Sequence, residues 1–170
     1  FRVHANDSLA LRDVKIKVDD GLWINMTSYD SIYNYTVDTT TLSDELHTIY
    51  YMARDFAGHT VSKSINITVD NIVPVVMIAY PSQDQYVEGT IVIKIRIIEG
   101  NIRNYTAYLD GSRIPIVYNA ETGYYEYTLD TTSLSEDVHI LVARVVDKAG
   151  SIGESSIDFY VDNSVPILRI

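Results

Sequence analysis

The sequence has 170 residues, of which 46% are hydrophobic, a mean hydropathy of +0.01 and a formal net charge of −10 at pH 7. This balance is typical of a globular chain, and its acidity argues against nucleic acid as a partner. The absence of cysteine excludes disulfides, thiolate metal sites and cysteine nucleophiles, and no stretch is apolar enough to span a bilayer. No basic, apolar leader follows Phe1, so we expect any targeting segment to lie outside this stretch.

Apolar residues recur at every second position along most of the chain, which is the spacing of β-strands with one buried face. Ile91, Ile93, Ile95 and Ile97, for example, alternate with Lys94 and Arg96. Turn signals such as Asp20-Gly21 and Asp110-Gly111 separate these runs, and no stretch has helical spacing. The pattern predicts strands near 1–6, 13–19, 32–37, 47–55, 62–70, 75–80, 90–98, 103–109, 124–129, 139–147 and 155–162.

The chain contains an internal repeat. The hexapeptide Val69–Pro74 returns as Val161–Pro166, 92 positions later, and its Asp-Asn pair and proline favour a turn or an extended exit. Further identical pairs at the same spacing are Tyr33/Tyr125, Tyr35/Tyr127, Asp38-Thr39-Thr40/Asp130-Thr131-Thr132, Leu42-Ser43/Leu134-Ser135, His47/His139, Asp55/Asp147 and Ala57-Gly58/Ala149-Gly150. About seven short strands per copy predict an all-β protein of two tandem immunoglobulin-like β-sandwiches.

The two copies differ at their beginnings. The second copy opens with the apolar run Val75–Tyr80, whereas Phe1 aligns near Ile93, so we expect the first sandwich to lack its opening strand. The domains are predicted as an incomplete one at 1–73, a full one at 74–165, and the opening strand of a further repeat at 166–170. We expect the sequence to be a window of a longer tandem array.

Each copy reads Tyr-x-Tyr-Thr-(Val/Leu)-Asp-Thr-Thr, Leu-Ser, His-x-(Ile/Leu), Asp-x-Ala-Gly and Val-Asp-Asn-x-x-Pro. This pattern resembles the bacterial and archaeal immunoglobulin-like repeats of surface-layer, adhesin and secreted multidomain proteins. The resemblance covers nearly the whole chain, but the family's asparagine after Ala-Gly is His59 or Ser151 here. It implies a spacer or adhesive module, and the fold alone does not decide between these.

The histidines offer no convincing catalytic site. His47 and His139 lie near Ser43, Ser135, Asp44 and Glu136, but the group recurs once per repeat at the start of a strand, which favours a structural role. No Gly-x-Ser-x-Gly elbow or His-Glu-x-x-His spacing is present. We therefore predict that this segment has no catalytic residues and is not an enzyme.

The acidic residues between strands raise the alternative of calcium. The candidate ligands are Asp55, Asp70, Asn71, Asp147, Asp162 and Asn163, which resemble the junction residues of cadherin-type repeats. Calcium takes six to eight oxygen ligands, and only three candidates per copy match. The competing interpretation is that Asp and Asn brace turns through their own backbone hydrogen bonds. We expect no cofactor other than this possible calcium.

Asn-x-Ser/Thr, the acceptor motif of N-glycosylation, accounts for five of the nine asparagines. These are Asn6, Asn25, Asn34, Asn66 and Asn104. The strand alternation places Asn34, Asn66 and Asn104 on outward faces, where glycans fit. Chance clustering in a Thr-rich β protein is the alternative.

These features predict a structural and adhesive spacer module of an extracellular cell-surface protein, such as a surface-layer protein or adhesin. The expected partners are neighbouring repeats of the same protein, and other surface proteins or glycans. One alternative is an accessory module of a secreted hydrolase. Another is a subunit of a surface filament, in which Ile167–Ile170 supplies the strand missing from the next subunit.

Overall fold

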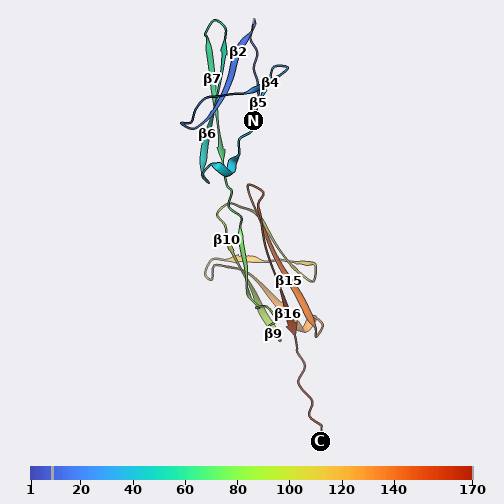
Figure 1. Cartoon of the computed structure of the whole chain (residues 1–170). Helices are drawn as coiled ribbons and strands as arrows, with labels where there is room; N and C mark the ends of the chain where they lie inside the picture. Colours follow the sequence, from blue (N-terminus) through green and yellow to red (C-terminus); the bar gives the residue numbers. More distant parts are fainter. Residues whose placement is uncertain (9, 170) are drawn as a thin grey trace. The chain divides into compact units, whose positions relative to one another are not determined.

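The computed structural model describes residues 1–8 and 10–169, and it divides the chain into two compact units, Phe1–Asn71 and Ile72–Ile170 (Figure 1). Apart from two single-turn 3₁₀ helices, all regular structure in the described residues is β-strand. The described part holds no helix with the length and apolarity that a membrane crossing needs. The all-β prediction is therefore confirmed.

Unit 1 is a sandwich of two antiparallel sheets. The first sheet has the order β1-β5-β4 and the second the order β3-β2-β6-β7. Their bounds are β1 Arg2–His4, β2 Leu11–Val18, β3 Ile24–Asn25, β4 Thr27–Tyr29, β5 Ile32–Asn34, β6 Leu46–Asp55 and β7 Thr60–Thr68.

Unit 2 is a larger sandwich of the same design. One sheet has the order β13-β14-β10-β8 and the other the order β12-β11-β15-β16-β9, in which β9 runs parallel to β16. The bounds are β8 Val75–Tyr80, β9 Tyr86–Val87, β10 Thr90–Ile98, β11 Ile102–Leu109, β12 Ser112–Ile114, β13 Val117–Asn119, β14 Tyr124–Asp130, β15 Val138–Asp147 and β16 Ile152–Val161.

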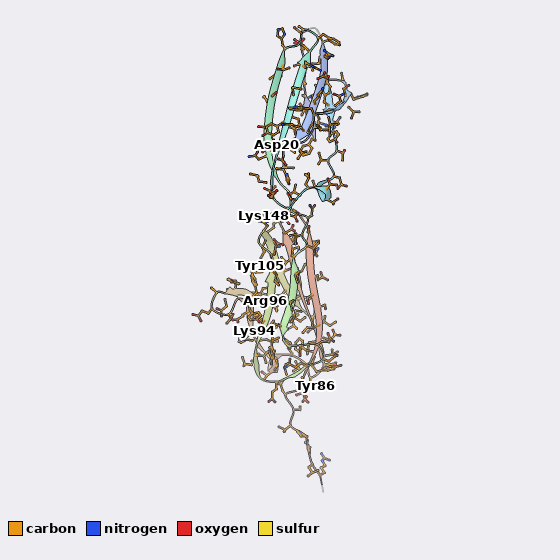
Figure 2. The ribbon with its side chains drawn as sticks, turned by 60° about the vertical axis from the view of Figure 1, so that its left-hand side comes forward. Asp20, Tyr86, Lys94, Arg96, Tyr105 and Lys148 are labelled. Carbon is orange, nitrogen blue, oxygen red and sulfur yellow. The ribbon has the colours of Figure 1, made fainter. Side chains whose placement is uncertain are left out.

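The cores follow from the two-residue period of the strands. On β10, Ile91, Ile93 and Ile95 are buried, while the labelled Lys94 and Arg96 of Figure 2 lie on the intervening positions. In unit 2 these isoleucines pack with Leu141, Phe159 and other buried apolar side chains from both sheets. In unit 1 the buried apolar cluster of the described residues is much smaller and consists of Val14, Ile16, Met26 and Ile49.

A single-turn 3₁₀ helix precedes β6 in unit 1 and β15 in unit 2. Thr39–Thr41 and Thr131–Ser133 begin after Asp38 and Asp130, whose carboxylates accept hydrogen bonds from the backbone N–H groups of Thr40 and Thr132 at 3.0 Å. The Thr40 hydroxyl and amide together lower the pKa of Asp38, and Thr132 does the same for Asp130. The repeated Asp-Thr-Thr motif is therefore a helix cap.

The opening edges of the two units differ as the sequence predicts. In unit 2, β10 lies between β14 and β8, and in unit 1 the matching strand β1 has β5 as its partner on one side. No strand of residues 1–8 or 10–169 pairs with the other side of β1. Within the described residues, the first sandwich therefore has no counterpart of β8.

The C-terminal residues after β16 form no strand up to Arg169, and Figure 1 shows them leaving the sheets of unit 2. Ile170 lies outside the described residues. The predicted boundaries 1–73, 74–165 and 166–170 stay predictions, because units defined by contacts need not coincide with the limits of a repeat.

Candidate functional site

A buried histidine ties a loop to a hairpin turn in each unit, and we call this group the histidine clasp. In unit 2 it comprises His139, Asp110 and Ser135. His139 Nδ1 lies 2.7 Å from Asp110 Oδ2, and its Nε2 lies 2.9 Å from the carbonyl oxygen of Ser135. Asp110 Oδ1 also accepts the backbone N–H of Ile140 at 2.9 Å. His139 is 5% exposed and packs against Phe159.

Unit 1 contains the equivalent clasp, formed by His47, Asp19 and Ser43. His47 Nδ1 lies 2.6 Å from Asp19 Oδ2, its Nε2 lies 2.9 Å from the Ser43 carbonyl oxygen, and Asp19 Oδ1 accepts the Thr48 amide at 2.7 Å. The hydrogen bonds to Asp19 and Ser43 raise the pKa of His47, and the hydrogen bond from His47 lowers the pKa of Asp19. The sequence indicates the histidines but not their aspartate partners.

The geometry of the clasp favours the protonated form of its imidazole. Both ring nitrogens of His139 face atoms that only accept hydrogen bonds, so both must donate, and only the imidazolium has two N–H groups. Each histidine contacts the serine's main-chain carbonyl, and the Ser43 hydroxyl donates to Glu45 at 2.6 Å. An imidazolium has no lone pair to accept a proton from a nucleophile, so this geometry suits a structural tie.

The predicted calcium ligands Asp55 and Asp147 each brace the turn that follows a long strand. Asp55 accepts the His59 amide and contacts His59 Nδ1, both at 2.8 Å, and these contacts lower the pKa of Asp55. Asp147 Oδ1 accepts the amides of Gly150 and Ser151 at 2.6 and 2.8 Å, and its buried Oδ2 has no hydrogen-bond partner in the structure. Ser151 stands where unit 1 has His59, which explains the difference.

The other predicted ligands also make local hydrogen bonds. Asn163 Oδ1 accepts the Gly89 amide at 2.9 Å and the Thr131 hydroxyl at 3.1 Å, and its Nδ2 donates to the Thr131 carbonyl. Asp162 accepts the Ser164 amide. Asn71 Nδ2 donates to the Thr39 carbonyl in unit 1.

Asp70 also has an interaction partner. Within residues 1–8 and 10–169, no three His, Cys, Asp or Glu side chains are arranged to hold a metal ion. Calcium binding at these positions stays a prediction.

The five predicted glycosylation acceptors are spread over both units. Asn6, Asn25, Asn66 and Asn104 are exposed, and Asn34 is half-buried. Asn34 Oδ1 accepts the Arg2 Nε–H at 3.4 Å, and Asn66 Oδ1 accepts the Thr48 hydroxyl at 3.1 Å. Their accessibility is compatible with modification, and glycosylation itself stays a prediction.

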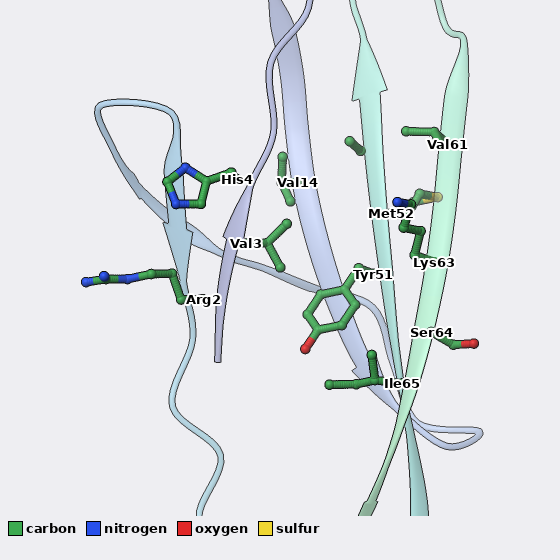
Figure 3. Close-up of a pocket in the computed structure, with 11 residues that line it drawn as sticks. Arg2, Val3, His4, Val14, Tyr51, Met52, Val61, Lys63, Ser64 and Ile65 are labelled. Atoms are coloured by element: carbon green, nitrogen blue, oxygen red, sulfur yellow. The ribbon is translucent and has the colours of Figure 1, made fainter.

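An open groove of about 450 Å³ lies between β1 and β7 in unit 1. Its walls are formed by Arg2, Val3 and His4 of β1, Val14 of β2, Tyr51, Met52 and Ala53 of β6, and Val61, Lys63, Ser64 and Ile65 of β7. Figure 3 shows Val3, Tyr51 and Ile65 directed toward the space between the two sheets. Partial burial raises the pKa of Tyr51. The groove is apolar inside and has three basic side chains at its rim.

Comparison with known proteins agrees with this architecture. Residues 74–143 match the model of the family described as bacterial Ig domain. No curated protein matches the sequence. The fibronectin(III)-like modules of Clostridium thermocellum CbhA are 17% identical, with 94% of this chain and 82% of that chain covered and a TM-score of 0.51. Residues 74–143 of unit 2 therefore resemble a bacterial Ig domain, and the resemblance read from the sequence is confirmed.

Two further solved structures have lower TM-scores. The endo-beta-1,4-mannanase from Thermotoga petrophila is 15% identical, with 56% of this chain and 21% of that chain covered and a TM-score of 0.49. A tetra-tandem repeat from the extending region of a large adhesion protein is 20% identical, with 92% and 43% covered and a TM-score of 0.43. The chain thus spans about a fifth of the mannanase, and at such identities the likeness concerns the fold alone.

Proposed function

We propose that this chain is a non-catalytic spacer segment of an extracellular cell-surface protein, with a structural and adhesive role. The histidine clasp supports this most directly. Histidine is the side chain of this chain best suited to acid–base catalysis. Both His47 and His139 instead tie a loop to a hairpin turn, with the same geometry in each unit. A tandem of braced β-sandwiches provides length and stiffness, which is what a spacer needs.

Single-molecule pulling of the whole chain tests the spacer role. We expect two separate unfolding events, one per unit, each lengthening the chain by roughly 200–300 Å at about 3.3–3.6 Å per extended residue. A chain that extends without any force peak would contradict the proposal, because a spacer has to resist extension.

The cell-surface location needs a separate test in the source organism. Protease treatment of intact cells, followed by detection of this segment with a specific antibody, is expected to remove the signal. A cytosolic protein detected in the same cells serves as the control and must survive. Protection of the segment in intact cells and its loss only after lysis would contradict an extracellular role.

We further propose that the exposed acceptor asparagines are glycosylated. The support is their accessibility, with Asn6, Asn25, Asn66 and Asn104 exposed. Intact-mass analysis of the protein from its native source is expected to show heterogeneous additions. Peptides that contain Asn66 or Asn104 should carry these additions, and the same peptides from an Asn66→Gln or Asn104→Gln variant should not. Asn101, a nearby asparagine without the motif, is the control. A native mass equal to that of the bare sequence would contradict glycosylation.

The alternative of an accessory module in a secreted hydrolase differs in location. In that case the segment would be found in the culture medium, attached to a protein with polysaccharide-degrading activity. Fractionation of cells and medium with the same antibody separates the two proposals. A filament subunit would instead appear in large assemblies whose size depends on strand exchange.

A further inference from the structure

A pocket of about 450 Å³ lies at the side of unit 2, where part of β11 has an uncovered edge. Strand β12 pairs with β11 only along Ala107–Leu109. The preceding part of β11, residues 102–106, pairs with β15 on its other side and forms one wall of the pocket. Residues 113–116, which are the end of β12 and the start of its connection to β13, form the other wall.

Pro115 explains why this edge is uncovered. In unit 1 the equivalent hairpin continues as far as the pair Lys15 and Asn25. In unit 2 the position of Asn25 is taken by Pro115, and the pairing ends at Ile114. Proline fixes φ near about −65°, whereas an antiparallel strand requires about −140°, so the chain bends away from β11 after Ile114. The pocket therefore results from an internal residue of unit 2.

The uncovered edge leaves a main-chain acceptor on the side of the pocket. In unit 1 the Met26 amide donates to the Val14 carbonyl at 2.9 Å, which closes the equivalent edge. The register with the neighbouring long strand makes Tyr105 the counterpart of Val14. Within residues 1–8 and 10–169, the Ile116 amide makes no such bond to Tyr105. The carbonyl of Tyr105 is therefore available to a ligand.

The pocket is basic although the chain is acidic, and we call it the arginine pocket. Arg103 and Arg113 line it, and none of the nine described residues that line it is acidic. Within the described part of the chain, neither guanidinium forms an ion pair or a hydrogen bond, whereas Arg54 of unit 1 is paired with Asp13. Two unpaired guanidinium groups at one pocket favour a carboxylate, which arginine binds with two parallel hydrogen bonds.

The equivalent region of unit 1 lacks this character. The strand register makes Asp13 the counterpart of Asn104. Trp23 is the counterpart of Arg113, because each directly precedes the isoleucine that pairs across the hairpin. Only Arg103 has a basic counterpart, which is Arg12. A carboxylate and an indole thus stand where unit 2 has an amide and a guanidinium, so the two units offer a comparison within one chain.

The other lining residues suit a sugar ring, which has an apolar face of C–H groups and a rim of hydroxyls. Ile102 and Pro115 offer apolar contact, and Asn104 and Thr106 offer an amide and a hydroxyl for hydrogen bonds. The volume lies within the range of small-molecule sites, about 300–1,000 Å³. An acidic peptide is a poorer occupant, because an added strand pairs through alternate residues and the uncovered edge, 102–106, is short.

We propose that the arginine pocket binds a carboxylate-bearing sugar unit of an acidic polysaccharide. The guanidinium groups of Arg103 and Arg113 hold the carboxylate. The side chains of Asn104 and Thr106 and the main-chain carbonyl of Tyr105 bind the hydroxyls of the sugar. The inference rests on the adhesive part of the proposed function, to which it adds a site and a class of ligand.

The test is a titration of the full chain with a tetrasaccharide of uronic acid units, followed by amide chemical shifts in NMR spectra. The chain is produced without glycans, so that Asn104 is unmodified. We expect saturable shift changes confined to residues 102–106 and 113–116. A neutral tetrasaccharide should bind at least about tenfold more weakly, since it lacks the charge-assisted hydrogen bonds. Added salt should weaken binding of the uronic acid tetrasaccharide, because the site is open to solvent.

Three variants separate a built site from general charge attraction. Arg113→Gln should weaken binding at least about tenfold. Arg96→Gln is the matched control, because Arg96 is also an exposed arginine of unit 2 but lies on β10 of the other sheet, and binding should not change. Pro115→Asn introduces the residue of unit 1 without changing any charge, and it should weaken binding by letting the hairpin cover the edge of β11.

Several outcomes would overturn the proposal: no saturable binding, equal binding of the neutral tetrasaccharide, or equal losses in Arg113→Gln and Arg96→Gln. Tighter binding of an oligoglutamate peptide would assign the pocket to an acidic peptide, and displacement by equimolar sulfate would reduce it to a simple anion site. Failure of binding would leave the pulling behaviour and the cell-surface location unaffected. Protection of the segment in intact cells would refute the extracellular role without changing this titration, so the two failures are distinguishable.

Discussion

Replacement of His139 by glutamine tests whether the protonated His139 side chain stabilises unit 2 against unfolding. Burial of the ring opposes its charge, but the hydrogen bonds to the Ser135 carbonyl and the Asp110 carboxylate outweigh burial, and the pKa of His139 is raised. The negative charges of Asp110 and Asp137 act in the same direction. A neutral amide side chain cannot donate to both acceptors from the ring positions, so His139→Gln removes the clasp.

The magnitude follows from the two hydrogen bonds. A hydrogen bond to a charged group contributes about 1.5–3 kcal/mol. Because the Asp110 side chain is 44% exposed, solvent screens its share of the interaction. We therefore expect His139→Gln to lower the free energy of unfolding of unit 2 by about 2 kcal/mol, which corresponds to a fall of about 10 °C in its midpoint.

The pH dependence has a definite sign. A histidine whose folded pKa is raised binds its proton more tightly in the folded state, so its contribution is fully present below the unfolded pKa of about 6.5. It is lost as the pH rises through the folded pKa. We expect unit 2 to be most stable at slightly acid pH and to lose stability above about pH 6.5, and His139→Gln to flatten this slope.

The assay uses two signals from one sample. Far-ultraviolet circular dichroism in a urea titration follows both units, and Trp23 fluorescence follows unit 1, so the difference reports unit 2. His139 is the only histidine between residues 72 and 170, which leaves few other groups in unit 2 that titrate between pH 6 and 9. Asp110→Asn is the matched variant, since it keeps an acceptor but removes the charge, and should shift the slope to lower pH.

Two results would refute the reasoning. One is a stability of unit 2 that does not change between pH 6 and 9 in the unmodified chain. The other is a His139→Gln variant that keeps the full slope, which would assign the titration to another group. A change in the Trp23 transition would show instead that the substitution disturbs unit 1.

Four further substitutions probe what stabilises each unit; three are measured by chemical denaturation and Gly153→Val by hydrogen exchange. Thr131→Ala should destabilise unit 2 by about 1–2 kcal/mol because it removes the hydrogen bond of the buried Thr131 hydroxyl to the Gly89 carbonyl, whereas Thr39→Ala at the exposed equivalent should cost less than about 0.5 kcal/mol; equal losses would contradict this. Gly153→Val should push Pro74 and the start of β8 away from β16 and speed hydrogen exchange along β8, and unchanged exchange would argue against the close approach. Leu141→Ala, at a fully buried position, should cost about 2–5 kcal/mol, and a loss below about 1 kcal/mol would mean that the core of unit 2 is loosely packed.

The long strands could be predicted from the sequence because their side chains alternate over many residues. Leu46–Asp55 and Val138–Asp147 were expected within one residue at their ends. The short strands Ile24–Asn25, Tyr86–Val87 and Val117–Asn119 were not predicted, since two or three residues cannot show a period. They exist because longer neighbours offer them a hydrogen-bonding edge.

The candidate sites were harder to predict, because their partners are distant in the chain. The repeat identifies His47 and His139, but their carboxylate partners Asp19 and Asp110 lie 28 and 29 residues earlier. In both copies an aspartate ends the first strand of a hairpin. This was the sequence feature that could have identified the partners of the two histidines. The alignment of the two copies indicates only that unit 1 has no counterpart of β8 in this sequence. The apolar walls of the groove are seen only in the structure, which places β1 and β7 on its two sides.

Equivalent residues of the two units differ in burial, and the difference follows from the strands that surround them. Thr39 and Thr131 share a sequence context, yet only Thr131 is buried, because unit 2 has β8, β9 and the Gly89 turn packed beside it. Val61 and Gly153 are equivalent, yet only Gly153 lies under an incoming chain. The difference in burial at these equivalent positions thus follows from neighbours that only unit 2 has within the described residues.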